Sequence, residues 1–455
     1  MASASTARID LCQGPLFRQM VVFTLPLILS GLLQLCFNAA DMIVVGRFAS
    51  AESLAAVGST GPLCNLIVTV FMGLSIGTNV VVAHFTGAKD PKAASRAVHT
   101  SIAVALWSGL GLVGLARFAV EPLLVWMKAP PEVFHLALVY SLVFCLGIPF
   151  NLLFNFGASI LRAVGDTRRP TRYLIYAGIL NVILNLLLVI VVRWDVMGVA
   201  IATVVSQALS AALVLRDLVR EPTFEATSDT AGIGLRWRLL RIDWPLFGRI
   251  ARIGLPAGLQ SSFFSVSNIL ILSAVASLGA AALAGNAAAG SLEGFAYVTG
   301  FAFQQAAISF VGQNYGGRQM PRVRRSILYA VLSEATAASV VAWTILIAGR
   351  SLLVFYTDQA NVIDFGMVRL RYMMPMYFVC PLMEVLAGSL RGMGRSIQPA
   401  VTTFLGACVL RVLWVTFLFP LHRTFGFIML SYPISWTLVC IVHAFFLVRM
   451  LRKNS

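Results

Sequence analysis

Charged side chains are scarce in this sequence: of its 455 residues 11% are charged, whereas 59% are hydrophobic, and the mean hydropathy is +0.86. Average soluble proteins are roughly a quarter charged, so an ordinary soluble domain is excluded. Lysine is especially rare, and none of the few lysines stands in a phosphate-binding P-loop pattern. The sequence therefore predicts no ATP hydrolysis of this type.

Signatures of metal and disulfide sites are also missing. The seven cysteines have no CxxC spacing and no histidine at ligand spacing, and most lie within apolar runs. They are interpreted as small apolar core residues. The five histidines show no ligand pattern either, so neither a metal nor another cofactor is expected, beyond a coupling ion.

Long apolar runs dominate what is present. Runs of about 20 residues are each able to cross a hydrocarbon core of about 30 Å as a helix. The sequence therefore predicts an all-α polytopic membrane protein in a lipid bilayer. Its twelve transmembrane helices are expected at residues 17–47, 54–85, 95–118, 131–159, 170–193, 197–219, 247–278, 283–312, 323–349, 361–392, 397–420 and 425–450.

Basic residues are unevenly divided between the two sides of this arrangement. The termini and even-numbered connections hold 25 of the 34 lysines and arginines, the odd-numbered connections hold 8, and Arg411 is left inside the eleventh span. By the positive-inside rule both termini are expected in the cytoplasm. The net charge of +16 is explained by this topology, and a nucleic-acid partner is not expected because the basic residues form no single face.

The chain reads as two copies of one unit. LRAVGDTRRP at 161–170 corresponds to LRGMGRSIQP at 390–399, and GAKD at 87–90 to GGRQ at 316–319, both at an offset of 229. Pro26 corresponds to Pro256 at 230, and Gly198 to Gly426 at 228. This predicts two six-helix lobes, residues 1–219 and 247–455, joined by a cytoplasmic linker at 220–246. Since each copy has six spans, the lobes should be related by a pseudo-two-fold axis along the membrane normal, as in secondary transporters.

The first span carries a line of polar residues. Ser30, Gln34, Asn38 and Asp41 follow one another at steps of 4, 4 and 3, so they share one helix face. Ionisable residues inside a membrane are costly and tend to mark ion or proton pathways. Asp41 is therefore the leading candidate for ion coupling, against the alternative that it is a structural carboxylate.

Depth supports a site around Asp41. With a rise of about 1.5 Å per residue, Asp41 lies about 9 Å below the outer face, Asn185 and Thr203 about 12 Å, and Asn181 about 18 Å. Polar residues of the first, fifth and sixth spans thus fall in one band. For the two asparagines the alternative is interhelical hydrogen bonding without a functional role.

At this point the sequence resembles the multidrug and toxic compound extrusion (MATE) family. The matching residues are LPLILSGLLQLCFNAADMIVVGRFASAESLAAVG in the first span, the paired LRAVGDTRRP and LRGMGRSIQP segments, FTGAKD, and VGQNYGGR. The resemblance covers essentially the whole chain and implies twelve helices in a V-shaped pair of lobes around a central cavity. It also implies export of organic, often cationic compounds in exchange for protons or sodium across a bacterial inner membrane.

Within the family the sequence resembles the DinF-like branch, in which Pro26, Asp41 and polar residues of the fifth and sixth spans match the coupling site of the amino-terminal lobe. Some relatives carry a second acid where this chain has Asn185. Sodium favours several oxygen ligands with charge, so a single carboxylate weakens the case for sodium coupling. It favours coupling to a proton instead. In the second copy Asp41 corresponds to Ile271, so coupling is expected in the first lobe alone.

The other candidates concern the substrate. Glu293 and Glu384 could line a cavity of the second lobe and attract cations, or could instead be counterions of Arg411. Aromatic residues suited to an apolar cavity include Tyr140, Phe154 and Tyr176, although most aromatics must be core. The expected partners are small organic molecules, and a monomer is expected.

Alternative functions remain open. A lipid-linked-precursor flippase of the same superfamily would share the two lobes but should place more basic residues in its cavity. A channel would not need an asymmetric carboxylate. An integral-membrane enzyme is least favoured, because no cluster of His, Asp or Cys converges at one depth.

Overall fold

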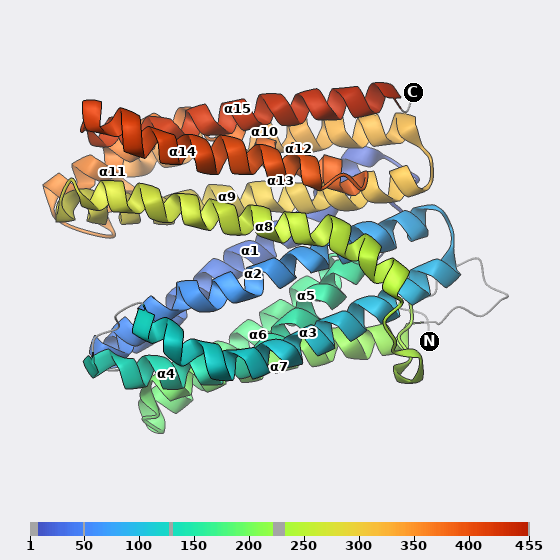
Figure 1. Cartoon of the computed structure of the whole chain (residues 1–455), viewed down its shortest axis with the longest axis horizontal. Helices are drawn as coiled ribbons and strands as arrows, with labels where there is room; N and C mark the ends of the chain where they lie inside the picture. Colours follow the sequence, from blue (N-terminus) through green and yellow to red (C-terminus); the bar gives the residue numbers. More distant parts are fainter. Residues whose placement is uncertain (1–7, 49–50, 127–130, 222–232, 454–455) are drawn as a thin grey trace. The chain divides into compact units, whose positions relative to one another are not determined.

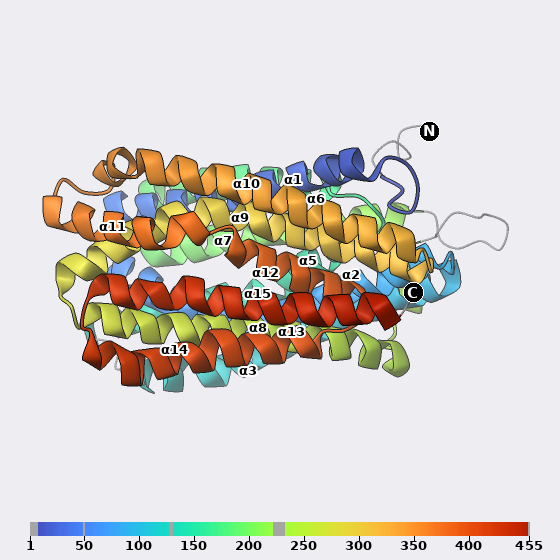
Figure 2. The ribbon, with the colours of Figure 1, turned by 90° about the horizontal axis from the view of Figure 1, so that it is seen from above.

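The computed structural model describes residues 8–48, 51–126, 131–221 and 233–453, and in these ranges every element longer than a single residue is a helix. Figures 1 and 2 show the helices of each half running side by side. The elements of the first half are α1 (Leu16–Phe48), α2 (Ala51–Gly87), α3 (Pro91–Trp126), α4 (Pro131–Leu146), α5 (Ile148–Ala163), α6 (Arg168–Asn185), η1 (Leu186–Val191) and α7 (Asp195–Arg220).

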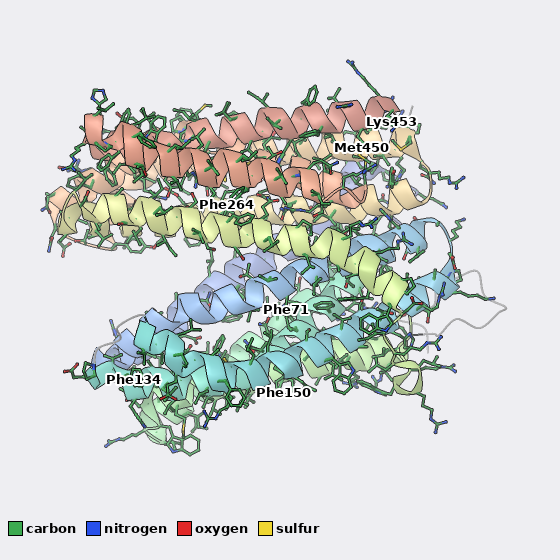
Figure 3. All side chains as sticks on the ribbon, viewed as in Figure 1. Phe71, Phe134, Phe150, Phe264, Met450 and Lys453 are labelled. Atoms are coloured by element: carbon green, nitrogen blue, oxygen red, sulfur yellow. The ribbon has the colours of Figure 1, made fainter. Side chains whose placement is uncertain are left out.

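The second half begins with the short η2 (Trp237–Leu239). It continues with α8 (Trp244–Ala276), α9 (Ala280–Gly316), α10 (Met320–Val354), α11 (Ala360–Met373), η3 (Met374–Met376) and α12 (Val379–Gly392). The eleventh predicted span is built from α13 (Ile397–Thr403), η4 (Phe404–Val409), α14 (Leu410–Leu413), η5 (Trp414–Leu418) and η6 (Phe419–Leu421), and the last is α15 (Phe425–Lys453). The side chains of Phe264 on α8 and of Met450 and Lys453 at the end of α15 are marked in Figure 3.

The all-α membrane fold is confirmed. Within the described ranges nine helices are long and apolar enough to cross a membrane, and eleven if each of two bent pairs counts as one span. These pairs are α4 with α5, bent by 41°, and α11 and η3 with α12, bent by 46°. The remaining predicted span, 283–312, lies in α9, a 37-residue helix that buries several polar side chains. Each of the twelve predicted spans thus lies on a helix or a broken helix.

The chain divides into two compact units that exchange parts of two helices. The first unit is Met1–Asp10 with Leu29–Gly258, and the second is Leu11–Ile28 with Leu259–Ser455. The predicted lobes, 1–219 and 247–455, placed all of α1 in the first lobe and α8 from Phe247 onward in the second. Instead α1 passes from the second unit to the first two residues after Pro26, and α8 leaves the first unit two residues after Pro256. A proline inside a helix removes one backbone hydrogen bond and permits a bend there.

The repeated sequence motifs fold into repeated turns. After α5 the amide of Asp166 donates to the carbonyl of Leu161 at 2.9 Å, and after α12 Arg395 donates to Leu390 at the same distance. Each turn contains a glycine with positive φ, 88° at Gly165 in the first, a conformation that glycine adopts without steric cost. The corresponding backbone therefore repeats at the offset seen in the sequence.

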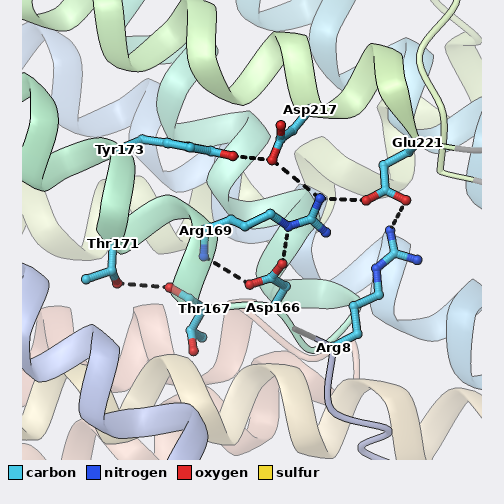
Figure 4. Close-up of polar contacts among 8 residues, drawn as sticks. All are labelled: Arg8, Asp166, Thr167, Arg169, Thr171, Tyr173, Asp217 and Glu221. Atoms are coloured by element: carbon cyan, nitrogen blue, oxygen red, sulfur yellow. Dashed lines mark hydrogen bonds and ion pairs between the residues drawn. The ribbon is translucent and has the colours of Figure 1, made fainter. Parts of the chain in front are cut away.

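The turn after α5 is stabilised by a cluster of ion pairs around Arg169, which corresponds to Gln398 in the second copy. The guanidinium of Arg169, at the start of α6, pairs with Asp166 and donates from Nη1 to Glu221 Oε1 at 2.6 Å (Figure 4). Glu221 Oε2 lies 2.5 Å from Arg8 Nη2, and Asp217 accepts from Arg169 and Tyr173. This cluster ties the start of α6 to the end of α7. It thereby sets the positions of two helices that carry polar residues toward α1.

Candidate functional site

A direct hydrogen bond joins α6 to α1. Asn185 Nδ2 donates to Asp41 Oδ1 at 2.5 Å and lies 3.3 Å from Asn181 Oδ1. Asn181 and Asn185 are buried, with 7% and 1% of their surface exposed, whereas Asp41 is half-buried. Asn185 Oδ1 is buried and has no hydrogen-bond partner in the described part of the chain. A carboxylate therefore lies beside an amide with one oxygen still able to accept.

These residues line a cavity of about 350 Å³ in the first unit. Among the described residues that line it, Asp41 is the one acid, and none is a lysine or an arginine. The lining residues are Gln34, Phe37, Asn38, Asp41, Val68, Thr69, Met72, Asn151, Phe154, Asn155, Leu174, Ala177, Gly178, Asn181, Thr203, Ser206, Gln207 and Ser210.

The hydroxyl groups in the lining donate to their own helix. Thr203 Oγ1 donates to the carbonyl of Val199 at 3.0 Å, and Ser206 Oγ to that of Ala202 at 2.7 Å. The hydroxyl protons are thus used within α7, which leaves oxygen lone pairs for the cavity. Together with the amides, these oxygens make the wall rich in hydrogen-bond acceptors.

The helices around the cavity approach closely at a glycine. A Cβ atom on Gly178 would lie 1.8 Å from the ring of Phe37, so this ring occupies the place of a side chain on α6. Nearer the start of α6, the hydroxyls of Ser30 and Thr171 are 2.7 Å apart. Both contacts hold α1 against α6, and so fix the distance across which Asp41 and Asn185 meet.

The predicted coupling residues Gln34, Asn38, Asp41, Asn181, Asn185 and Thr203 therefore lie together, at or next to the cavity. The prediction missed Asn151 and Asn155 on α5, and Gln207 and Ser210 on α7. A signal for them exists: Thr203, Gln207 and Ser210 follow at steps of 4 and 3, the same helical spacing that singled out α1.

The three aromatic residues predicted to line a substrate cavity lie in different places in the structure. Phe154 lines the cavity, but Tyr140 is buried against Phe144 in a core formed by the ends of α1, α4, η1 and α7. Tyr176 lies on the exposed face of α6. Among these three aromatics, the cavity contains Phe154 alone.

The predicted substrate-binding carboxylates Glu293 and Glu384 have partners other than Arg411. Glu293 forms a bidentate pair with Arg369, with distances of 2.6 and 2.7 Å. Glu384 accepts from Gln260 at 3.1 Å and from Gln304 at 2.5 Å. The alternative that they neutralise Arg411 is therefore wrong. Arg369, one of the eight basic residues counted with the odd-numbered connections, is buried in α11.

Comparison with known proteins agrees with this architecture. The family model MatE matches residues 26–187 and again 256–416, and each match begins at one of the two helix prolines. The chain is 26% identical to the probable multidrug resistance protein YpnP of Bacillus subtilis over 88% of each sequence. It is 25% identical to the FAD transporter of Shewanella oneidensis over 71% of each.

A solved structure with a similar fold is the outward-facing conformation of a multidrug resistance MATE family transporter of the MOP superfamily. It aligns with a TM-score of 0.90 over 100% of both chains at 22% identity. Because the family model matches well over half of the sequence, in two copies, the chain belongs to the MATE family of multidrug efflux transporters.

Proposed function

We propose that this protein is a secondary antiporter that exports organic cations or amphipathic compounds in exchange for protons, and that Asp41 carries the exchanged proton. The observation behind the proposal is that Asp41 is the one acid among the described residues that line the cavity of the first unit. A cation and a proton compete for a single negative charge there. Binding of one then releases the other, which is the requirement for exchange.

The neighbouring amide suits both charge states of this carboxylate. When Asp41 is ionised it accepts from Asn185 Nδ2, as in the hydrogen bond at 2.5 Å. When Asp41 is protonated its hydroxyl needs an acceptor, and rotation of the amide presents Asn185 Oδ1, which has no hydrogen-bond partner among the described residues. Proton transfer is thereby coupled to a side-chain rearrangement between α1 and α6.

Sodium is the alternative coupling ion. Hard cations prefer several oxygen ligands, often with more than one carboxylate, whereas the other polar residues of the lining are neutral. This composition favours the proton.

The passage of α1 between units supports a mechanical role for Pro26. The helix leaves one unit for the other two residues beyond this proline. A change of bend at Pro26, biased by the hydrogen bonding of Asp41, would alter the cavity wall and expel the substrate.

A second candidate is transport of anionic compounds, including lipid-linked precursors, and it is favoured by the relative named as an FAD transporter. Against it, the cavity lining, as far as the structure describes it, contains an acid and no basic side chain. The charge distribution along the chain supports a bacterial inner-membrane location with both termini in the cytoplasm. We propose that the protein acts there as a monomer and without a bound cofactor.

Purified protein in liposomes tests the function. Efflux of a cationic dye should follow an imposed proton gradient and should stop when a protonophore collapses it. Efflux that follows a sodium gradient, with no response to the proton gradient, would replace the proton by sodium. Transport of an anionic nucleotide cofactor in preference to the dye would favour the second candidate.

A further inference from the structure

A buried guanidinium without an acidic partner lies in the second unit. Arg411, on α14, is 1% exposed, and no carboxylate lies within ion-pair distance of it in the ranges that the structure describes. Its Nε donates to Ser435 Oγ at 3.0 Å, its Nη1 to Asn268 Oδ1 at 3.3 Å, and its Cζ lies 4.3 Å from the ring centre of Tyr432. A full positive charge is thus held by neutral oxygens and an aromatic ring.

These oxygens are disposed to receive a cation. Ser435 Oγ gives its proton to the carbonyl of Tyr432 at 2.8 Å, so a lone pair is left for Arg411. A ring face attracts a cation directly. Buried arginines in proteins are ordinarily paired with acids, because a lone buried charge is costly. Arg411 departs from this pattern, so the burial of its charge without an acid needs an explanation.

The duplication of the sequence explains why this arginine is buried without an acid. At the offset of 230 that relates the two helix prolines, Asn268 corresponds to Asn38, which lines the cavity of the first unit. Asp41 corresponds to Ile271, an apolar residue that is 1% exposed. The ligands of Arg411 therefore belong to the second copy of the proposed coupling site, and in this copy the acid is missing.

The last helix gives the same correspondence. At the offset of 228 that relates Gly198 to Gly426, Ser435 corresponds to Gln207, another residue of the cavity wall. Two of the contacts of Arg411 are thus the counterparts of residues that surround the cavity in the first copy.

A local change of helix type brings Arg411 itself into register. At an offset of 229 its counterpart is Val182, but α14 follows the π-helical turn η4, which holds one extra residue compared with an α-helical turn. With this one-residue shift, Arg411 corresponds to Asn181 of the first copy. Ser267 Oγ donates to the carbonyl of Ala407 within this turn at 2.8 Å, which satisfies a carbonyl of the irregular turn.

From this correspondence we propose that Arg411 is a tethered cation that permanently fills the second copy of the coupling site. The assignment rests on the proposed function of the first copy, where Asp41 faces an open cavity and exchanges its ion. In the second copy the guanidinium takes the place of that ion. Its charge repels any further cation, so that exchange is confined to the first unit.

Chemical rescue tests the tethered cation independently of transport. Arg411→Ala removes the atoms of ethylguanidinium, so this ion should bind the vacated site and raise the unfolding temperature of the variant in detergent. At tenfold excess over its Kd the shift should be about 1.5 °C for cooperative unfolding of a chain of this length. Ethylurea, which is similar in shape and neutral, should have no such effect. Wild type and Arg350→Ala, which alters an exposed pair with Asp364, should not respond.

The rescue experiment remains informative if Arg411→Ala folds poorly. If Arg411→Ala can be purified only with ethylguanidinium present, the proposal is supported. Equal responses to ethylguanidinium and ethylurea would overturn it, as would a variant that neither ligand rescues.

A transport experiment tests the consequence for coupling. In Ile271→Asp/Arg411→Asn the second copy regains an acid and loses the cation, so the number of ions moved per substrate should rise toward twice the wild-type value. Ile271→Asn/Arg411→Asn is the matched control and should keep the wild-type ratio. An active double variant with an acid at 271 and an unchanged ratio would contradict the role of Arg411. If Asp41→Asn transported its substrate with the wild-type ion ratio, that result would contradict the proposed function. The chemical rescue of Arg411→Ala would not be affected by it.

Discussion

Asn185 Nδ2 on α6 donates to Asp41 Oδ1 on α1 at 2.5 Å, across 144 residues of sequence. The bond connects two helices whose remaining contacts in this region include the packing of Phe37 on Gly178. A change in the charge of Asp41 therefore acts directly on the interface between α1 and α6. The first two predictions concern its two partners.

Asp41→Asn should abolish ion-coupled efflux, because the amide cannot take up or release a proton. The substitution keeps the shape of the side chain and an oxygen that can accept from Asn185, so folding should be preserved. Dye efflux driven by a proton gradient in liposomes should fall to the level of empty vesicles, while the unfolding temperature stays near that of wild type. Efflux at the wild-type rate would place coupling elsewhere.

Asn185→Asp should change the preference for the coupling ion. Two carboxylates on facing helices provide the charge and oxygen ligands that sodium favours. Dye efflux from liposomes should then respond to an imposed sodium gradient, and the binding of sodium should become measurable by its effect on the unfolding temperature. Asn185→Leu, which offers no oxygen, serves as the control. No sodium response in a folded Asn185→Asp variant would show that the cavity lacks the remaining ligands.

Pro26→Ala should impair transport without weakening the fold. Alanine restores the backbone donor that proline lacks and favours the helix by about 3 kcal/mol, so α1 should resist bending where it passes between units. Transport rate and thermal stability are measured on the same preparation. Pro122→Ala is the control, since this proline also lies inside a helix, α3, and is exposed. Equal losses in both variants would remove the special role of Pro26.

Much of the candidate site could be predicted because a membrane helix constrains position along one axis. The steps between Gln34, Asn38 and Asp41 define a face, and counting from charged residues at the span ends gives depth, so Asp41 and Asn185 could be placed in one band of the bilayer. Their direct hydrogen bond is seen only in the structure. The contribution of α5 could not be found in this way. Asn151 and Asn155 line the cavity from α5, which follows a bend of 41° after α4.

The ion pair between Arg369 and Glu293 could not be predicted from positions along the helices. Arg369 lies 76 residues from Glu293 and was counted only as a charge of the outer side, whereas it is buried in α11. Sequence counts cannot tell whether an arginine near a helix end reaches outward to water or inward to an acid. Likewise, the passage of α1 and α8 between units occurs inside continuous helices, where neither composition nor a loop marks a boundary.

The arginine cluster at the start of α6 should matter for stability. In Arg169→Ala the buried side chains of Asp166 and Glu221 lose their shared partner, which should cost about 3–5 kcal/mol of unfolding free energy. Thermal unfolding in detergent measures the loss. Arg350→Ala, at an exposed pair, should cost about 1 kcal/mol or less. Equal effects of the two substitutions would show that the cluster does not hold α6 and α7 together.

Substrate and proton should compete for Asp41. Binding of a quaternary ammonium dye should weaken as pH falls, because protonation removes the negative charge that attracts the cation. By linkage the dye opposes proton binding by the same factor, and coupling energies of this kind correspond to roughly 5- to 150-fold changes in affinity. Dye affinity measured by fluorescence from about pH 8 down to about pH 5 should therefore fall in wild type and stay constant in Asp41→Asn. A neutral substrate should show little change in either protein. A pH dependence that survives in Asp41→Asn would assign the competing charge to another group, with Glu384 of the second unit as the next acid to substitute.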